Sequence, residues 1–116
     1  MTDIKQTGHL VALCTVPDQA TATILAEKLV AERLAACVNI VPGIQSVYQW
    51  QGNIEHDNEL LLIIKTRADA FAALEQAILQ YHPYELPEII AVSIEAGSSA
   101  YLEWINNALG TNNHAS

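Results

Sequence analysis

Short apolar runs and longer stretches of helical periodicity alternate along this chain. His9 to Val16 is a run of apolar and β-branched residues that predicts a strand buried on both faces. Residues 19–36 are rich in Ala, Leu and Glu, with apolar positions at helical spacing, and predict a helix. Further strands are predicted at 37–41, 44–51, 54–57, 59–67 and 89–95. A second helix is predicted from Asp69 to Tyr81, and a third carries Leu102, Ile105 and Leu109.

Turn and capping residues punctuate this pattern. Asp18 is a good helix N-cap, and Asp69 is placed to cap the second helix. Pro42-Gly43 is expected to stop a strand, and Gly52-Asn53 is a turn signal between the two arms of a hairpin. Pro83 is expected to end the second helix, and an irregular loop follows over 82–88.

The resulting order is β-α-β-β-α-β with an appended helix and a long central hairpin. It predicts an α+β fold of the ferredoxin-like, split β-α-β type. The runs at 9–16 and 59–67 are the most apolar, as expected for the two inner strands of such a sheet. We expect one domain over residues 9–109, with flexible ends at 1–8 and 110–116.

Charge and cysteine content limit the partners and the compartment. The formal charge is −8, which repels nucleic-acid phosphates and anionic membrane surfaces but suits metal cations. The longest purely apolar run, Leu60 to Ile64, is far too short to span a bilayer. The N-terminal residues lack a secretory pattern and the two cysteines form no disulfide framework, so we expect a cytoplasmic protein.

Motifs for nucleotide or redox chemistry are missing from the sequence. It contains no G-x-G-x-x-G, no Walker loop and no C-x-x-C. Cys14 has no base evident in the sequence and no pair of carboxylic acids stands out, so an enzyme is the weakest of the functional hypotheses.

Three residues are candidate metal ligands. Cys14 lies near the end of the first strand, either as a buried core thiol or as a soft ligand suited to Cu(I) or Zn(II). His82 and Glu88 bracket the proline-containing loop, either as solvated loop residues or as metal ligands. Cys37 is most simply explained by core packing, and His9, His56 and His114 are single and unclustered.

The hairpin carries Tyr48 and Trp50 on one side. Aromatic side chains on a projecting hairpin usually mark an interface, because leaving them in water is costly. The alternative is packing against the last helix of the same chain, through Tyr101 or Trp104. We favour the interface, because a long hairpin presents strand edges that need covering.

Seven motifs, in this order, resemble those of the CutA family of divalent-ion tolerance proteins, and the resemblance covers residues 9 to 109. They are Val11-Ala12-Leu13-Cys14-Thr15-Val16-Pro17, Glu32-Arg33-Leu34-Ala35-Ala36-Cys37-Val38-Asn39, Val41-Pro42-Gly43-Ile44, Tyr48-Gln49-Trp50-Gln51-Gly52, Glu59-Leu60, Ile64-Lys65-Thr66 and His82-Pro83-Tyr84-Glu85-Leu86-Pro87-Glu88.

The resemblance implies a ferredoxin-like protomer in a homotrimer similar in plan to PII signalling proteins, with the hairpins joining neighbouring sheets edge to edge. It also implies a link to copper and other divalent cations, with Cys14, His82 and Glu88 as the metal ligands. Some family members have His-His-Pro-Tyr where this chain has Tyr81-His82-Pro83-Tyr84. We therefore predict a cytosolic, trimeric copper-binding or divalent-cation-binding protein of metal tolerance. The alternatives are a PII-like signalling trimer that binds a small molecule between subunits, and a structural partner of another protein.

Overall fold

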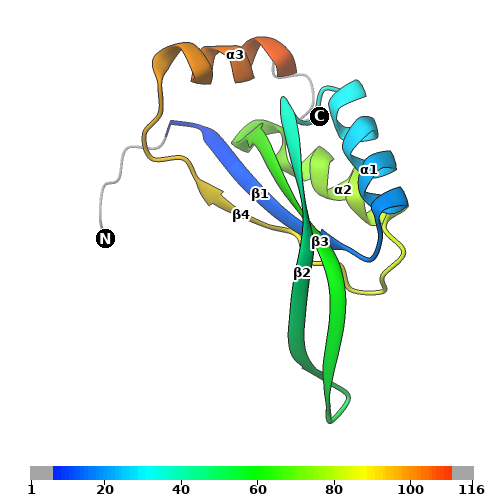
Figure 1. Cartoon of the computed structure of the whole chain (residues 1–116). Coiled ribbons are helices and arrows are strands. Elements are labelled where there is room, and N and C mark those ends of the chain that lie inside the picture. Colours follow the sequence, from blue (N-terminus) through cyan, green and yellow to red (C-terminus); the bar gives the residue numbers. More distant parts are fainter. Residues whose placement is uncertain (1–6, 111–116) are drawn as a thin grey trace.

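The computed structural model describes residues 7–110 and contains one four-stranded sheet, with its helices arranged as in Figure 1. In chain order the elements are β1 His9–Val16, α1 Gln19–Ala31, β2 Cys37–Trp50, β3 Asn53–Arg67, a 3-10 turn at Ala68–Ala70, α2 Phe71–Tyr81, β4 Ile90–Ser93 and α3 Ser99–Leu109. This is the predicted β-α-β-β-α-β order with an appended helix, so the α+β, ferredoxin-like fold is confirmed.

The sheet is antiparallel, in the order β2-β3-β1-β4. β1 pairs along its whole length with β3, from His9 opposite Arg67 to Val16 opposite Leu60. The prediction that the two most apolar strands lie innermost is therefore correct. β3 runs beyond the end of β1. The part of the β2–β3 hairpin that extends past β1, residues 44–59, is called the hairpin arm below. The hairpin arm projects away from the body of the molecule in Figure 1.

One face of the sheet packs against α1 and α2 (Figure 1). Ala12, Cys14 and Val16 of β1 alternate toward the helices, because successive strand residues point to opposite faces. They form the main core with residues of β3, α1 and α2 that include Leu62, Ile64, Leu25, Leu29, Leu74 and Ile78.

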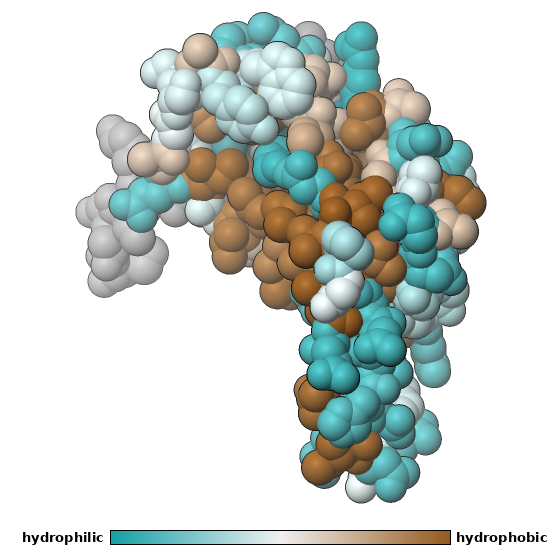
Figure 2. All heavy atoms as spheres, viewed as in Figure 1, coloured by the Kyte–Doolittle hydropathy of each residue, from teal (hydrophilic) through white to brown (hydrophobic). Residues whose placement is uncertain are grey.

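The other face of the sheet is largely uncovered. The residues between the core positions point to this side, and Figure 2 shows a hydrophobic area below α3. The apolar members of this open face are Val11, Leu13, Val41, Leu61, Ile63, Ile90 and Val92. Ile90 and Val92 are 54% and 56% exposed. The prediction that β1 is buried on both faces is thus wrong within one chain, because only α3 lies on this side, at one end of the sheet (Figure 1).

The first helix ends at Ala31, five residues earlier than predicted. Asp18 caps its start as expected, since its carboxylate accepts a hydrogen bond from the Thr21 N–H at 2.8 Å. At the other end Arg33 adopts φ +59°, the left-handed conformation that closes a Schellman motif. The Leu34 N–H donates to the Leu29 carbonyl at 2.9 Å, which turns the chain toward β2.

Three further boundaries differ from the predictions. Pro42-Gly43 does not end a strand but forms a bulge within β2, between Val41 and Ile44. The hairpin turn is Gln51-Gly52, both at positive φ, rather than Gly52-Asn53, and the return arm and third strand are one continuous β3. β4 covers only Ile90–Ser93, shorter than the 89–95 predicted.

Asp69 does not cap α2. Its carboxylate instead accepts a hydrogen bond from Arg67 Nε at 3.0 Å, and α2 begins at Phe71 without a side-chain cap. The end of α2 at Tyr81 agrees with the effect expected of Pro83. The two ends predicted to be flexible lie mostly outside the described residues, which exclude 1–6 and 111–116. His114 also lies outside them.

No helix within residues 7–110 is long and apolar enough to cross a membrane.

Truncation of Leu62 to Ala should destabilise the protein by about 2–5 kcal/mol, because Leu62 is fully buried in the main core and its loss leaves a cavity. Denaturant unfolding at fixed protein concentration measures this loss. Ile24→Ala is the matched control, since Ile24 is 62% exposed on α1, and should change stability by about 0.5 kcal/mol or less. Equal losses in the two variants would contradict the assigned core.

Candidate functional site

A cleft of about 600 Å³ lies between the base of the hairpin arm and the loop that follows α2. Thr15, at the end of β1, lies at the junction of these two segments. The lining residues are Thr15, Ser46, Val47, Tyr48, Trp50, Asp57, Glu59, Tyr84, Glu85, Leu86 and Glu88. Four of them are carboxylates, three carry aromatic rings and none is Lys or Arg, so the cleft is both acidic and aromatic.

Glu59 is the buried carboxylate of this cleft, with only 6% of its surface exposed. It accepts one hydrogen bond from Ser46 Oγ at 2.5 Å and one from the Tyr84 hydroxyl at 2.7 Å. Both donors are neutral, and no Lys, Arg or His between residues 7 and 110 forms an ion pair with Glu59. Within residues 7–110 this buried carboxylate therefore has no counter-ion, although buried charges are usually paired.

The tyrosines of the cleft keep their protons and act as donors. Tyr48 donates to Asp57 across the hairpin arm, and this hydrogen bond raises the pKa of Tyr48 to about 12. Burial and the hydrogen bond to Glu59 raise the pKa of Tyr84 far above its usual value. In both tyrosines the hydroxyl therefore keeps its proton and donates a hydrogen bond to a carboxylate of the cleft.

His82, the first residue after α2, is held by two backbone groups. Its Nε2 donates to the Thr15 carbonyl at 2.7 Å, and its Nδ1 accepts a hydrogen bond from the Tyr84 N–H at 3.1 Å. Its ring also contacts that of Tyr84 at a centroid distance of 4.7 Å. His82 thus ties the loop to the end of β1, and both ring nitrogens are occupied in this arrangement.

Cys14 lies beside the cleft, on the helix-covered face of the sheet, with none of its surface exposed. Burial, with the charges of Glu88 and Glu59, raises the pKa of the Cys14 thiol to about 12. The thiol is therefore protonated at neutral pH, whereas metal coordination requires the thiolate.

The structure brings the three predicted metal ligands into one region without making them converge. Glu88 lines the cleft, but Cys14 and His82 do not. No group of three or more His, Cys, Asp or Glu side chains in the described part of the chain is placed to hold a metal ion. A metal site built from Cys14, His82 and Glu88 would need the loop to rearrange and the thiol to lose its proton.

The other sulfur and imidazole groups are dispersed. Cys37 is half-buried on the open face of the sheet, with Lys65 Nζ at 4.0 Å from its Sγ, so the expectation that it packs in the core is wrong. His9 is buried, and its Nε2 hydrogen-bonds Asn106 Oδ1 at 2.9 Å, which ties β1 to α3. His56 is exposed on the hairpin arm.

Tyr48 and Trp50 share one side of the hairpin arm, as predicted, and both line the cleft. They do not pack on α3, because the arm and α3 lie at opposite ends of the molecule (Figure 1). Tyr101 and Trp104 of α3 stack on one another instead, at 5.4 Å between ring centroids.

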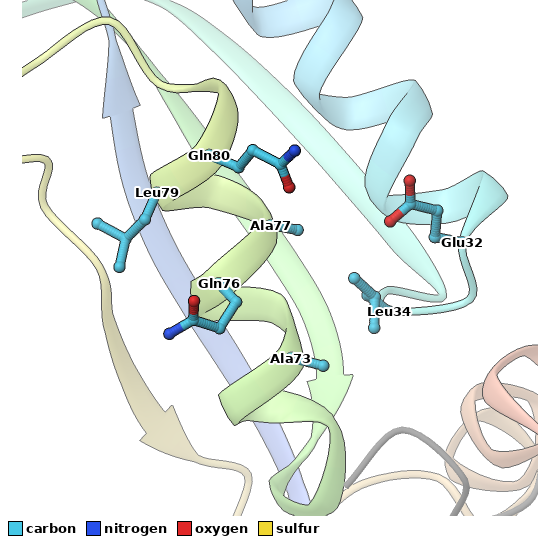
Figure 3. A pocket seen from close by; sticks show the side chains of 7 residues that line it. All are labelled: Glu32, Leu34, Ala73, Gln76, Ala77, Leu79 and Gln80. Atoms are coloured by element: carbon cyan, nitrogen blue, oxygen red, sulfur yellow. The ribbon is translucent and has the colours of Figure 1, made fainter. Parts of the chain in front are cut away.

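A second hollow lies between the end of α1 and α2 (Figure 3). Ala73, Ala77 and Gln80 point toward Glu32 and Leu34 across it, whereas Leu79 and Gln76 point away. Glu32 is the single titratable group in its lining, so this hollow offers little chemistry.

Glu59 and Asp57 line the cleft, and the sequence analysis did not single them out as candidate site residues. The signal was present, because the two carboxylates alternate along β3 directly opposite Ile44 and Ser46 of β2. Residue type alone does not reveal the cleft, because the burial of Glu59 depends on Tyr84, which approaches from a loop 25 residues away.

Comparison with known proteins gives one consistent result. The family model described as CutA1 divalent ion tolerance protein matches residues 10–108. A divalent-cation tolerance protein CutA from Thermus thermophilus is 49% identical over 100 residues, covering 86% of this chain and 97% of its own. Its Escherichia coli K12 counterpart is 42% identical over 105 residues, covering 90% and 94%. The crystal structure of CutA from Xylella fastidiosa superimposes with a TM-score of 0.88 at 43% identity, covering 90% of this chain and all of that one.

The raised pKa of Cys14 predicts a loss of stability in alkali. The folded thiol holds its proton to about pH 12 while the unfolded thiol releases it near 9.0, so the folded state binds more protons between these values. The contribution of the protonated Cys14 thiol to the free energy of unfolding is therefore complete below pH 9. It is lost as the pH rises toward 12, at up to about 1.4 kcal/mol per pH unit.

Unfolding free energies of Cys14→Ala should consequently fall less steeply between pH 9 and 11 than those of the wild type. Cys37→Ala is the control and should retain the wild-type slope. Parallel slopes for the wild type and Cys14→Ala would contradict the burial of the thiol.

Proposed function

Because this chain belongs to the CutA1 family of divalent ion tolerance proteins, we propose that it acts as a cytoplasmic homotrimer in the response to divalent cations, copper among them. It acts by binding and not by catalysis. The proposal of a trimer rests on the uncovered apolar face of the sheet.

The open face supports self-association. Its seven apolar side chains lie on all four strands, so they form one continuous surface rather than scattered exposed residues. Contiguous exposed apolar surface of this kind marks a protein interface. Copies of the same chain are the simplest partner, since every copy carries the same surface to be buried.

The hairpin arm supports the same assembly. β2 and β4 are the two edges of the sheet, and β2 extends along the arm with no strand on its outer side. Val47 and Ile54 near the tip of the arm are 58% and 69% exposed. Pairing between copies would cover both the free edge and these side chains.

A charge on the open face should dissociate the trimer. Val92→Glu places a carboxylate on this face where the side chain is already half-exposed, so the protomer can still fold. Light scattering at micromolar concentration should give a trimer mass for the wild type and a monomer mass for Val92→Glu. Ile24→Glu, on α1 in the opposite layer, should remain trimeric. A wild-type monomer, or a trimeric Val92→Glu variant, would overturn the proposed assembly.

Cys14, His82 and Glu88 are the proposed copper ligands, and the protomer geometry sets conditions on them. His82 must give up one of its two hydrogen bonds, to the Thr15 carbonyl or from the Tyr84 N–H, and Cys14 must release a proton that burial holds tightly. Copper binding at these residues therefore releases protons and strengthens as the pH rises.

Titration of Cu(I) and Cu(II) into the wild type, Cys14→Ser and His82→Ala tests this ligand set. We expect affinity that increases from pH 6 to pH 8 in the wild type and is lost in both variants while the trimer persists. Cys37→Ser is the matched control and should bind as the wild type does. Affinity that ignores pH, or that ignores both ligand substitutions, would rule out these three ligands.

A ligand site in the cleft is a second candidate function, and the shape of the cleft favours it. A hollow of about 600 Å³ with aromatic walls and a few polar groups is typical of small-molecule sites. In this chain the arm and the loop of one protomer already supply both walls.

A further inference from the structure

We propose that the cleft between the hairpin arm and the loop after α2 binds a small organic cation, an ammonium or guanidinium group on an apolar or aromatic body. The inference rests on the second candidate function, a ligand site in the cleft, and not on copper binding. Its basis is the pairing of a buried, uncompensated carboxylate with an aromatic wall.

Glu59 supplies the first part of the recognition. Its two oxygens each accept one hydrogen bond, from Ser46 and from Tyr84, and both donors are neutral hydroxyls. Each carboxylate oxygen has a second lone pair, so both oxygens can still accept from a charged N–H donor. A cationic group that enters the cleft would supply the counter-ion that Glu59 does not find among residues 7–110.

The charge of the lining makes the cleft selective for cations. Asp57, Glu85 and Glu88 accompany Glu59, and no Lys or Arg of residues 7–110 lines the cleft. Anionic ligands, including nucleotide phosphates, are therefore excluded by charge.

The walls favour an organic cation over a bare metal ion. The rings of Trp50, Tyr48 and Tyr84 line the cleft, and Leu86 adds apolar surface. Such rings attract ammonium and guanidinium groups and also bury the carbon body that carries them. In contrast, the carboxylates of the described residues do not converge in the way that the ligands of a metal ion do.

Three probes of the same shape separate charge from hydrophobicity: 2-phenylethylamine as the cation, 2-phenylethanol as the neutral analogue and phenylacetate as the anion. Trp50 reports binding once Trp104→Phe removes the other tryptophan of the chain. We expect the amine to change Trp50 fluorescence saturably, the alcohol to bind roughly tenfold more weakly and phenylacetate to produce no saturable change.

Carboxylate variants test which group recognises the cation. Glu59→Gln and Glu88→Gln, made in the Trp104→Phe background, should each weaken binding of the amine, Glu59→Gln by roughly tenfold or more. Glu88 is exposed at the rim, so Glu88→Gln keeps the test valid if Glu59→Gln fails to fold. Glu27→Gln is the matched control, because Glu27 is exposed on α1 outside the cleft, and should bind as the parent does.

The outcomes are distinguishable. Equal binding of amine and alcohol, or no effect of either cleft variant, would overturn the cation proposal but leave a ligand site in the cleft. Binding of phenylacetate that is tighter than binding of the amine would also overturn the cation proposal and leave a ligand site in the cleft. No response of Trp50 to any probe would count against the ligand site itself. Displacement of the amine by Cu(II) at equimolar concentration, lost in Glu59→Gln, would assign the cleft to metal and overturn the proposal.

Discussion

The structure depends on the ladder between β1 and β3. These two inner strands pair over all eight residues of β1, and this register decides which side chains point toward the helices and which point away. Toward the helices it places small and branched residues such as Ala12 and Ile64, which leave room for α1 and α2 to pack closely. On the other side it aligns Val11, Leu13 and Ile63 into an apolar face that the chain itself does not cover.

The unequal lengths of the strands create the site. β3 has 15 residues and β1 has eight, so β3 and its partner β2 continue past the end of the sheet as the hairpin arm. β4 pairs with β1 only as far as Leu13, and beyond it the Thr15 carbonyl accepts from His82, which fixes the loop after α2 beside the arm. Tyr84 of this loop then reaches Glu59, and the cleft forms between the two segments.

The order and type of the elements followed from local patterns in the sequence. The apolar runs identified β1 and β3 as inner strands, and Asp18 marked the start of α1 because its capping hydrogen bond is local. The end of α1 was missed because the left-handed position is Arg33 rather than the usual Gly. The bulge at Pro42-Gly43 was missed because it is defined by pairing with β3, which the local residues do not reveal.

The site was harder to predict than the fold. The sequence indicated the loop at 82–88 as a candidate site, but not the partners that its residues contact. His82 bonds a carbonyl 67 residues earlier in the chain, and Glu59 meets Tyr84 from a different element. Such contacts depend on tertiary placement, so residue type alone predicts neither the tether at His82 nor the acidic cleft around Glu59.

The incomplete sheet leads to the central claim, that the sheet of one chain is completed by other copies of itself. Amide hydrogen exchange of the wild-type protein at micromolar concentration tests it most directly. The claim predicts that the amides of the edge strands β2 and β4 exchange nearly as slowly as those of β1 and β3, because neighbouring chains cover both edges. Fast exchange along both edges, with protection confined to β1 and β3, would contradict it.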